Sequence, residues 1–106
     1  MNTSAMSETA CRTITLIKQH AVLFDAFSEV YLFGSVLDNN RRFAEDVDLL
    51  LLYTELTDAL IDSAKLIRTT LGQQIGKPID LTILSFAEEQ EVHFVDRLNA
   101  RYYRIK

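Results

Sequence analysis

Two short apolar runs on either side of a polar loop constrain the fold of this chain more than any other feature. The runs cover residues 30–33 and 47–53, and their length and composition predict two β-strands. Asp46 and Asp48 stand at the start of the second run. Alternate residues of a strand point to the same face, roughly 6.6 to 7 Å apart. The two aspartates are therefore expected to project together, with Val47 on the other side.

Two carboxylates aimed at one point repel each other unless a cation lies between them. Hard, oxygen-preferring Mg²⁺ suits such a pair. Gly34-Ser35 follows the first run, and ten residues separate Ser35 from Asp46. A turn of this kind supplies backbone N–H groups and a hydroxyl for a phosphate. Metal and phosphate together predict phosphoryl or nucleotidyl transfer.

An Asp-x-Asp pair alone is most often a solvated strand end. Gly-Ser followed by Asp-x-Asp at one fixed spacing arises by chance in only on the order of one in a thousand chains of this length. The flanking strands, which the chemistry requires, make chance less frequent still. The combination therefore favours the functional interpretation.

The rest of the chain predicts an α+β fold, a small mixed β-sheet backed by helices. Ser7 caps a first helix that runs to about residue 26, with Ile14, Ile17, Ala21 and Phe24 on one face. A second helix covers 57–74, with Leu60, Ala64, Ile67 and Leu71 at helical spacing. Strand 79–84 follows, then a helix from the capping box at Ser85 to about residue 98. Residues 102–105 can form a short edge strand.

The composition predicts one domain over residues 1–106, with residues 1–6 disordered. No run approaches the ~20 apolar residues of a membrane span, and the N-terminus lacks the pattern of a signal peptide. The single Cys11 fits a reducing cytoplasm. A net charge of −4 argues against general nucleic-acid binding. The basic, tyrosine-containing stretch 97–106 is equally well explained as a solvated tail or as a partner-contacting surface.

The segment from Gly34 to Asp48 resembles the GS-x10-DxD signature of the DNA polymerase β-like nucleotidyltransferase superfamily. The short chain is similar to the minimal nucleotidyltransferases, the MntA-type antitoxins encoded beside HEPN-domain partners. The resemblance covers about residues 14–96 and implies the nucleotidyltransferase, polymerase β-like palm fold. It places the third carboxylate of the family on Asp80, in the strand 79–84. Asp80 reaches the same metal position if that strand neighbours the strand 47–53.

The resemblance also implies how the site works. Asp46, Asp48 and Asp80 would be the catalytic residues and would hold two Mg²⁺ ions. Gly34 and Ser35 would bind the β- and γ-phosphates of ATP, and Arg42 falls where the family often keeps a basic residue for nucleotide binding. The loop departs from the family pattern, because Asp38 and Asn39 occupy the usual Arg-Gly positions and Glu45 replaces a serine.

Three functions remain open at this point. The first is Mg²⁺-dependent transfer of AMP from ATP to a tyrosine of a HEPN-type toxin, for which the chain would be the cytoplasmic antitoxin. The second is an inactive nucleotidyltransferase fold that neutralises the toxin by binding. The third is nucleotidyl transfer to a small molecule, whose enzymes usually carry a helical domain for which this chain has no length. Retention of three carboxylates favours the first.

Overall fold

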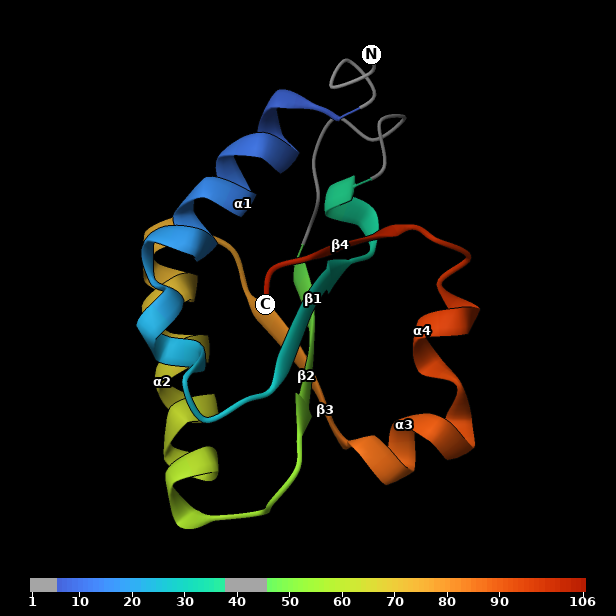
Figure 1. Ribbon diagram of the computed structural model, residues 1–106. Helices are drawn as coiled ribbons and strands as arrows, with labels where there is room; N and C mark the ends of the chain where they lie inside the picture. The colour runs from blue at the N-terminus through green and yellow to red at the C-terminus, as the bar shows by residue number, and fades with distance from the viewer. Residues whose placement is uncertain (1–5, 38–45) are drawn as a thin grey trace.

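Four strands form one mixed sheet in the order β3-β2-β1-β4 in the computed structural model, which describes residues 6–37 and 46–106 (Figure 1). The strands are β1 (Glu29–Phe33), β2 (Val47–Tyr53), β3 (Ile79–Ser85) and β4 (Tyr102–Arg104). β1 lies antiparallel to β2 and to β4, whereas β3 lies parallel to β2. The predicted α+β fold and the predicted neighbourhood of the second and third strands are confirmed.

β2 is a central strand with apolar side chains on both faces. Leu49 and Leu51 belong to one core cluster, Leu50 and Leu52 to another, and none of the four is more than 2% exposed. In Figure 1, α1 (Glu8–Gln19) and α2 (Asp58–Ile75) cover one face of the sheet, while α3 (Phe86–Val92) and α4 (Phe94–Arg97) lie on the other. The continuous apolar run of β2 follows from this burial on both sides.

The first helix ends earlier than the sequence predicts. Ser7 caps it as expected, through a 3.0 Å bond from the N–H of Ala10 to the Ser7 hydroxyl. The helix stops at Gln19, and a separate 3₁₀ turn, η2 (Ala21–Phe24), follows. Phe24 is buried as expected, but Ala21 is exposed. The chain must reverse here to enter β1, and the tighter turn keeps Phe24 in the core while Ala21 faces solvent.

The second helix agrees closely with its prediction. Thr57 caps α2 by accepting a bond from the N–H of Leu60, and all four predicted apolar residues of its inner face are buried. Gly76 ends the helix in the left-handed conformation, at φ 80°, as a glycine just beyond a helix commonly does.

The last helix is interrupted at His93, which the sequence does not predict. The capping box at Ser85 and Glu88 opens α3 as expected, but His93 takes a left-handed φ of 52° and separates α3 from α4. This break lets Phe94 and Val95 pack against the core cluster of Tyr31, Leu50 and Leu52. The buried apolar contacts explain why one straight helix is not formed.

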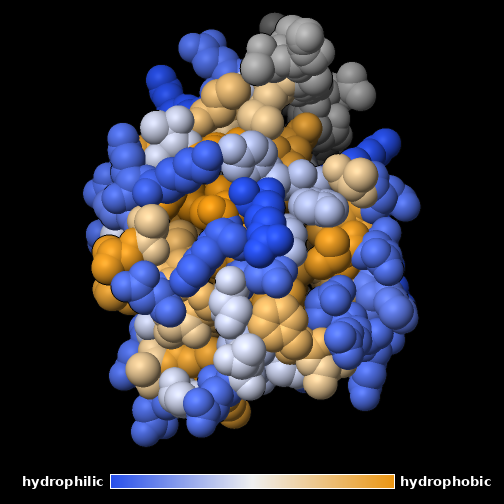
Figure 2. Space-filling model, in the orientation of Figure 1, coloured by the Kyte–Doolittle hydropathy of each residue, from blue (hydrophilic) through white to orange (hydrophobic). Residues whose placement is uncertain are grey.

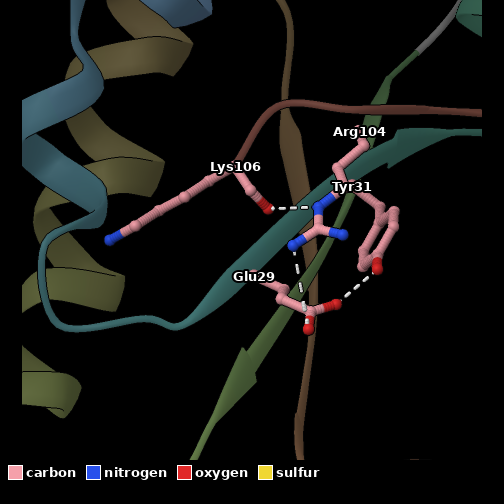
Figure 3. A network of polar contacts seen from close by, with 4 residues as sticks. All are labelled: Glu29, Tyr31, Arg104 and Lys106. Atoms are coloured by element: carbon pink, nitrogen blue, oxygen red, sulfur yellow. Dashed lines mark hydrogen bonds and ion pairs between the residues drawn. The ribbon is translucent and has the colours of Figure 1, made fainter.

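β4 attaches the C-terminal segment to the sheet, so this segment is not a free tail. Glu29 on β1 accepts a hydrogen bond from the Tyr31 hydroxyl and lies 3.8 Å from the Arg104 guanidinium (Figure 3). Nε of Arg104 donates to the Lys106 carbonyl at 2.9 Å, and Nζ of Lys106 donates to the Phe24 carbonyl at 3.0 Å. Figure 2 shows hydrophilic side chains gathered over β4, with hydrophobic surface on both sides.

Two further predictions concern disorder at the N-terminus and the absence of a membrane-spanning segment. Residues 1–5 lie outside the described residues, while Met6, predicted to be disordered with them, packs half-buried against the core. Among residues 6–37 and 46–106, no helix is long and apolar enough to cross a lipid bilayer.

Candidate active site

Three carboxylates meet at the end of the sheet where β2 and β3 begin. One carboxylate oxygen from each of Asp46, Asp48 and Asp80 lies within 4.8 Å of the other two. Asp46 directly precedes β2, Asp48 is its second residue, and Asp80 is the second residue of β3. Strand alternation puts Asp46 and Asp48 on the same face, as predicted, and the structure brings Asp80 beside them.

The register between the strands places Asp80 directly beside Asp48. The two residues are partners in the parallel β2–β3 pairing. The N–H of Val47 donates to the Pro78 carbonyl at 2.9 Å, which fixes this register at the first residue of β2. A shift by one residue would turn Asp80 to the opposite face. The cluster therefore depends on this pairing as much as on the acids themselves.

Gly34 lies in contact with the Asp48 carboxylate. Gly34 has a φ of 86°, and a Cβ atom at this position would lie 2.1 Å from Oδ2 of Asp48. The position requires glycine twice, once for the left-handed backbone and once for space. The Gly34 turn and the acid cluster are consequently parts of one site.

Ser35 begins a short 3₁₀ turn, η3 (Ser35–Leu37), which follows β1. The N–H of Leu37 donates to the Gly34 carbonyl at 3.1 Å, and the side chain of Val36 is buried in the core. These contacts hold the turn in place directly after Gly34. Arg42, predicted to bind nucleotide, lies outside the described residues together with Asp38, Asn39 and Glu45.

The electrostatics of the cluster suit a bound cation. Burial, followed by the neighbouring charges of Asp46 and Asp80, raises the pKa of Asp48 from 3.8 to about 6. Crowded carboxylates repel each other, and a divalent cation between them would remove that repulsion. The donor set consists of oxygens alone, which fits Mg²⁺ rather than a metal that prefers nitrogen or sulfur. Asp46, Asp48 and Asp80 are thus the residues able to hold it.

An aromatic pair borders the site on the β1 side and was not predicted. Phe33 is the antiparallel partner of Asp48, so both side chains lie on one face. The Phe33 ring meets the Phe94 ring edge-on, with centroids 5.3 Å apart. The position of Phe33 directly before Gly34 could have indicated that it borders the site. Phe94, in contrast, reaches the site only through the break at His93.

A model of one protein family matches most of the chain. The family is described as polymerase beta, nucleotidyltransferase, and the match covers residues 15–98. That span contains all three clustered aspartates and the Gly34-Ser35 turn. Among curated proteins, none matches this chain.

Several solved structures share the fold. A Shewanella oneidensis complex of a tri-AMPylated HEPN toxin with its MNT antitoxin matches at 15% identity and a TM-score of 0.56, over 92% of this chain and 71% of the other. A mutant of the toxin–antitoxin pair MntA-HpeT matches at 13% identity and a TM-score of 0.57, over 89% and 72% of the two chains. A candidate nucleotidyltransferase from Sulfolobus solfataricus matches at 19% identity and a TM-score of 0.51, over 92% and 82%.

Proposed function

The chain belongs to the polymerase β nucleotidyltransferase family, and we propose that it transfers AMP from ATP to a tyrosine of a HEPN-type toxin and thereby acts as its antitoxin. The observation that carries the proposal is the convergence of three carboxylates within 4.8 Å, packed against a glycine turn that can receive phosphates. Both halves of a nucleotidyl-transfer site are thus adjacent in the fold.

The chemistry would proceed as an in-line displacement at the α-phosphorus of ATP. The Gly34-Ser35 turn binds the β- and γ-phosphates through its backbone N–H groups and the Ser35 hydroxyl, with Arg42 as a further phosphate contact. Asp46, Asp48 and Asp80 would hold Mg²⁺, which would supply neutralising charge for the triphosphate and for the departing pyrophosphate.

The transfer forms one bond to the α-phosphorus and breaks another. The tyrosine oxygen forms a new bond to the α-phosphorus, and the bond between that phosphorus and the oxygen of the pyrophosphate breaks. Asp80 receives the proton of the tyrosine hydroxyl and passes it to solvent. No side chain of the protein becomes covalently modified, so the rate enhancement comes from positioning and electrostatic stabilisation.

Support for a protein acceptor comes from the structural neighbours. One of them contains an MNT antitoxin together with a HEPN toxin that carries AMP groups, and another is a toxin–antitoxin pair. The competing proposals are a HEPN-binding antitoxin without activity and nucleotidyl transfer to a small molecule.

The test uses a protein encoded in a neighbouring reading frame and selected for a HEPN-type sequence. ATP labelled at the α-phosphate should leave label on that protein in the presence of Mg²⁺, whereas ATP labelled at the γ-phosphate should not, because pyrophosphate departs. Asp80→Asn should reduce labelling at least a hundredfold. If no label transfers and Asp80→Asn still neutralises the toxin, the chain is a binding antitoxin.

A further inference from the structure

β3 is a long strand at the edge of the sheet, and its outer side is open among the described residues. It ends the strand order at β3-β2-β1-β4, and no strand in ranges 6–37 and 46–106 pairs with its outer side. The seven residues Ile79–Ser85 contain no proline, lysine or arginine, and their one charged residue, Asp80, belongs to the acid cluster. Protein sheets commonly protect such an edge with charges, proline or a very short strand. The opposite edge strand, β4, has three residues and carries Arg104.

The register identifies which backbone groups of β3 face outward. The N–H of Val47 donates to the carbonyl of Pro78, so even-numbered residues of β3 direct their N–H and C=O groups toward β2. Backbone groups alternate in direction along a strand. The N–H and C=O groups of Leu81 and Ile83 therefore point away from the sheet and can pair with another strand.

The acid cluster extends across the sheet to the open edge at β3. Gly34 follows β1, Asp48 lies on β2 and Asp80 lies on β3, so the three groups succeed one another across the sheet toward its open edge. An in-line displacement needs the acceptor and the pyrophosphate on opposite sides of the α-phosphorus. With phosphates at the β1 side, the acceptor comes from the β3 side, where Asp80 is exposed.

We propose that the acceptor polypeptide docks as an added strand on the outer edge of β3. Pairing with the backbone of Leu81 and Ile83 would place the acceptor strand about 4.8 Å beyond β3. A tyrosine of that strand beside Asp80 would then point to the face that holds the carboxylates. Strand addition gives affinity through main-chain bonds and leaves specificity to the side chains. This inference rests on the proposed function, and its occupant is an extended, tyrosine-bearing segment of the HEPN-type partner.

Amide hydrogen exchange provides the first test. The labelled chain is measured alone and with the HEPN-type protein selected for the transfer test, Mg²⁺ and α,β-methylene-ATP, which holds the state before transfer. The outward amides of Leu81 and Ile83 should exchange at least tenfold more slowly in the complex. The inward amides of Asp80 and Thr82, already bonded to β2, are the internal control and should change less than twofold.

A proline substitution provides the second test. Ile83→Pro removes one outward donor without breaking a bond to β2, and an outward-facing position of an edge strand is one of the places where a strand tolerates proline. AMP transfer should fall at least tenfold, while binding of ATP with Mg²⁺ stays within twofold. Tyr102→Pro is the matched control, because it changes an exposed residue of the opposite edge strand, and transfer should stay within twofold. If Ile83→Pro does not fold, the exchange experiment on the unaltered chain decides.

The two levels of the proposal fail in different ways. Absence of label on the partner with the unaltered chain contradicts the proposed transfer. Unchanged exchange at Leu81 and Ile83 in the complex overturns strand docking, whether or not label transfers. Slow exchange at these amides in the chain alone, growing with its concentration, would assign the edge to a second copy of this chain and would also overturn the proposal.

Discussion

Gly34 and Asp48 fit together so closely that no other residue can replace the glycine without moving the carboxylate. A Cβ atom at position 34 would lie 2.1 Å from Oδ2 and 3.0 Å from Cγ of Asp48. The residues are neighbours because Phe33, the last residue of β1, pairs with Asp48 on β2. The turn and the acid cluster are therefore coupled mechanically, and a change in one should be measurable in the other.

Gly34→Ala should destabilise the protein and displace the Asp48 carboxylate. The left-handed backbone alone costs about 1–3 kcal/mol for a residue other than glycine, and the clash adds to it. Gly76→Ala is the matched control, since Gly76 has a similar φ of 80° but no atom within 4 Å of the added Cβ. In urea unfolding, Gly34→Ala should lose at least about 1 kcal/mol more than Gly76→Ala. Equal losses would show that the close contact is absent in solution.

Asp48→Asn should stabilise the metal-free protein at neutral pH. The pKa of Asp48 is raised to about 6, so the folded protein favours the protonated carboxyl. The stability that goes with this protonated form is fully present below pH 3.8 and is lost as pH rises through 6. Asp48 is half-buried, and after discounting for solvent screening the ionised form costs about 1 kcal/mol.

Thermal melts in EDTA measure this difference. Asp48→Asn should melt about 4 °C higher than the unaltered chain at pH 7.5 and at nearly the same temperature at pH 4. Asp62→Asn, at an exposed position of α2, serves as the control and should show no such pH dependence. A large loss of stability in Asp48→Asn would instead mean that the carboxylate has a structural role.

Binding of ATP should depend on the metal and on the three acids. Mg²⁺ binds through few carboxylates together with substrate phosphates, so ATP with Mg²⁺ should bind at least tenfold more tightly than ATP with EDTA. Calorimetry on the double variant Asp46→Asn, Asp48→Asn should show no difference between the two conditions. Equal binding to the unaltered chain with Mg²⁺ and with EDTA would refute the metal assignment.

Tyr31→Phe should destabilise the protein by removing a side-chain hydrogen bond within β1. The Tyr31 hydroxyl donates to Glu29, and hydrogen bonds to charged groups contribute about 1.5–3 kcal/mol. Burial, followed by this bond to Glu29, raises the pKa of Tyr31 to about 12. Its contribution is therefore present below pH 10 and is lost as pH rises toward 12.

Urea unfolding at pH 6 and pH 9 should give the same loss for Tyr31→Phe, about 2 kcal/mol. Tyr102→Phe is the control, because Tyr102 is 36% exposed, and it should change stability by less than about 0.5 kcal/mol. A loss no larger than that of the control would mean that the bond to Glu29 contributes little.

Much of the fold was predictable because its signals are local. The buried face of α2 follows from residues spaced three and four apart, and the starts of α1 and α3 follow from the capping side chains of Ser7 and Ser85. The end of the first helix at Gln19 and the break at His93 were not predictable in this way. Both are imposed by packing against residues that are distant in the chain.

The site likewise has features that local sequence determines and features that depend on distant parts of the chain. The sequence alone determined that Asp46 and Asp48 share a face, since alternation along one strand needs no other part of the chain. Tertiary structure decided that Asp80 joins them and that Gly34 touches Asp48, because both depend on how β3 and β1 align with β2. It also decided that Phe94 borders the site and that no other strand of the described residues covers the outer edge of β3. Strand register is a long-range choice, made by the burial of whole faces, and no short segment specifies it by itself.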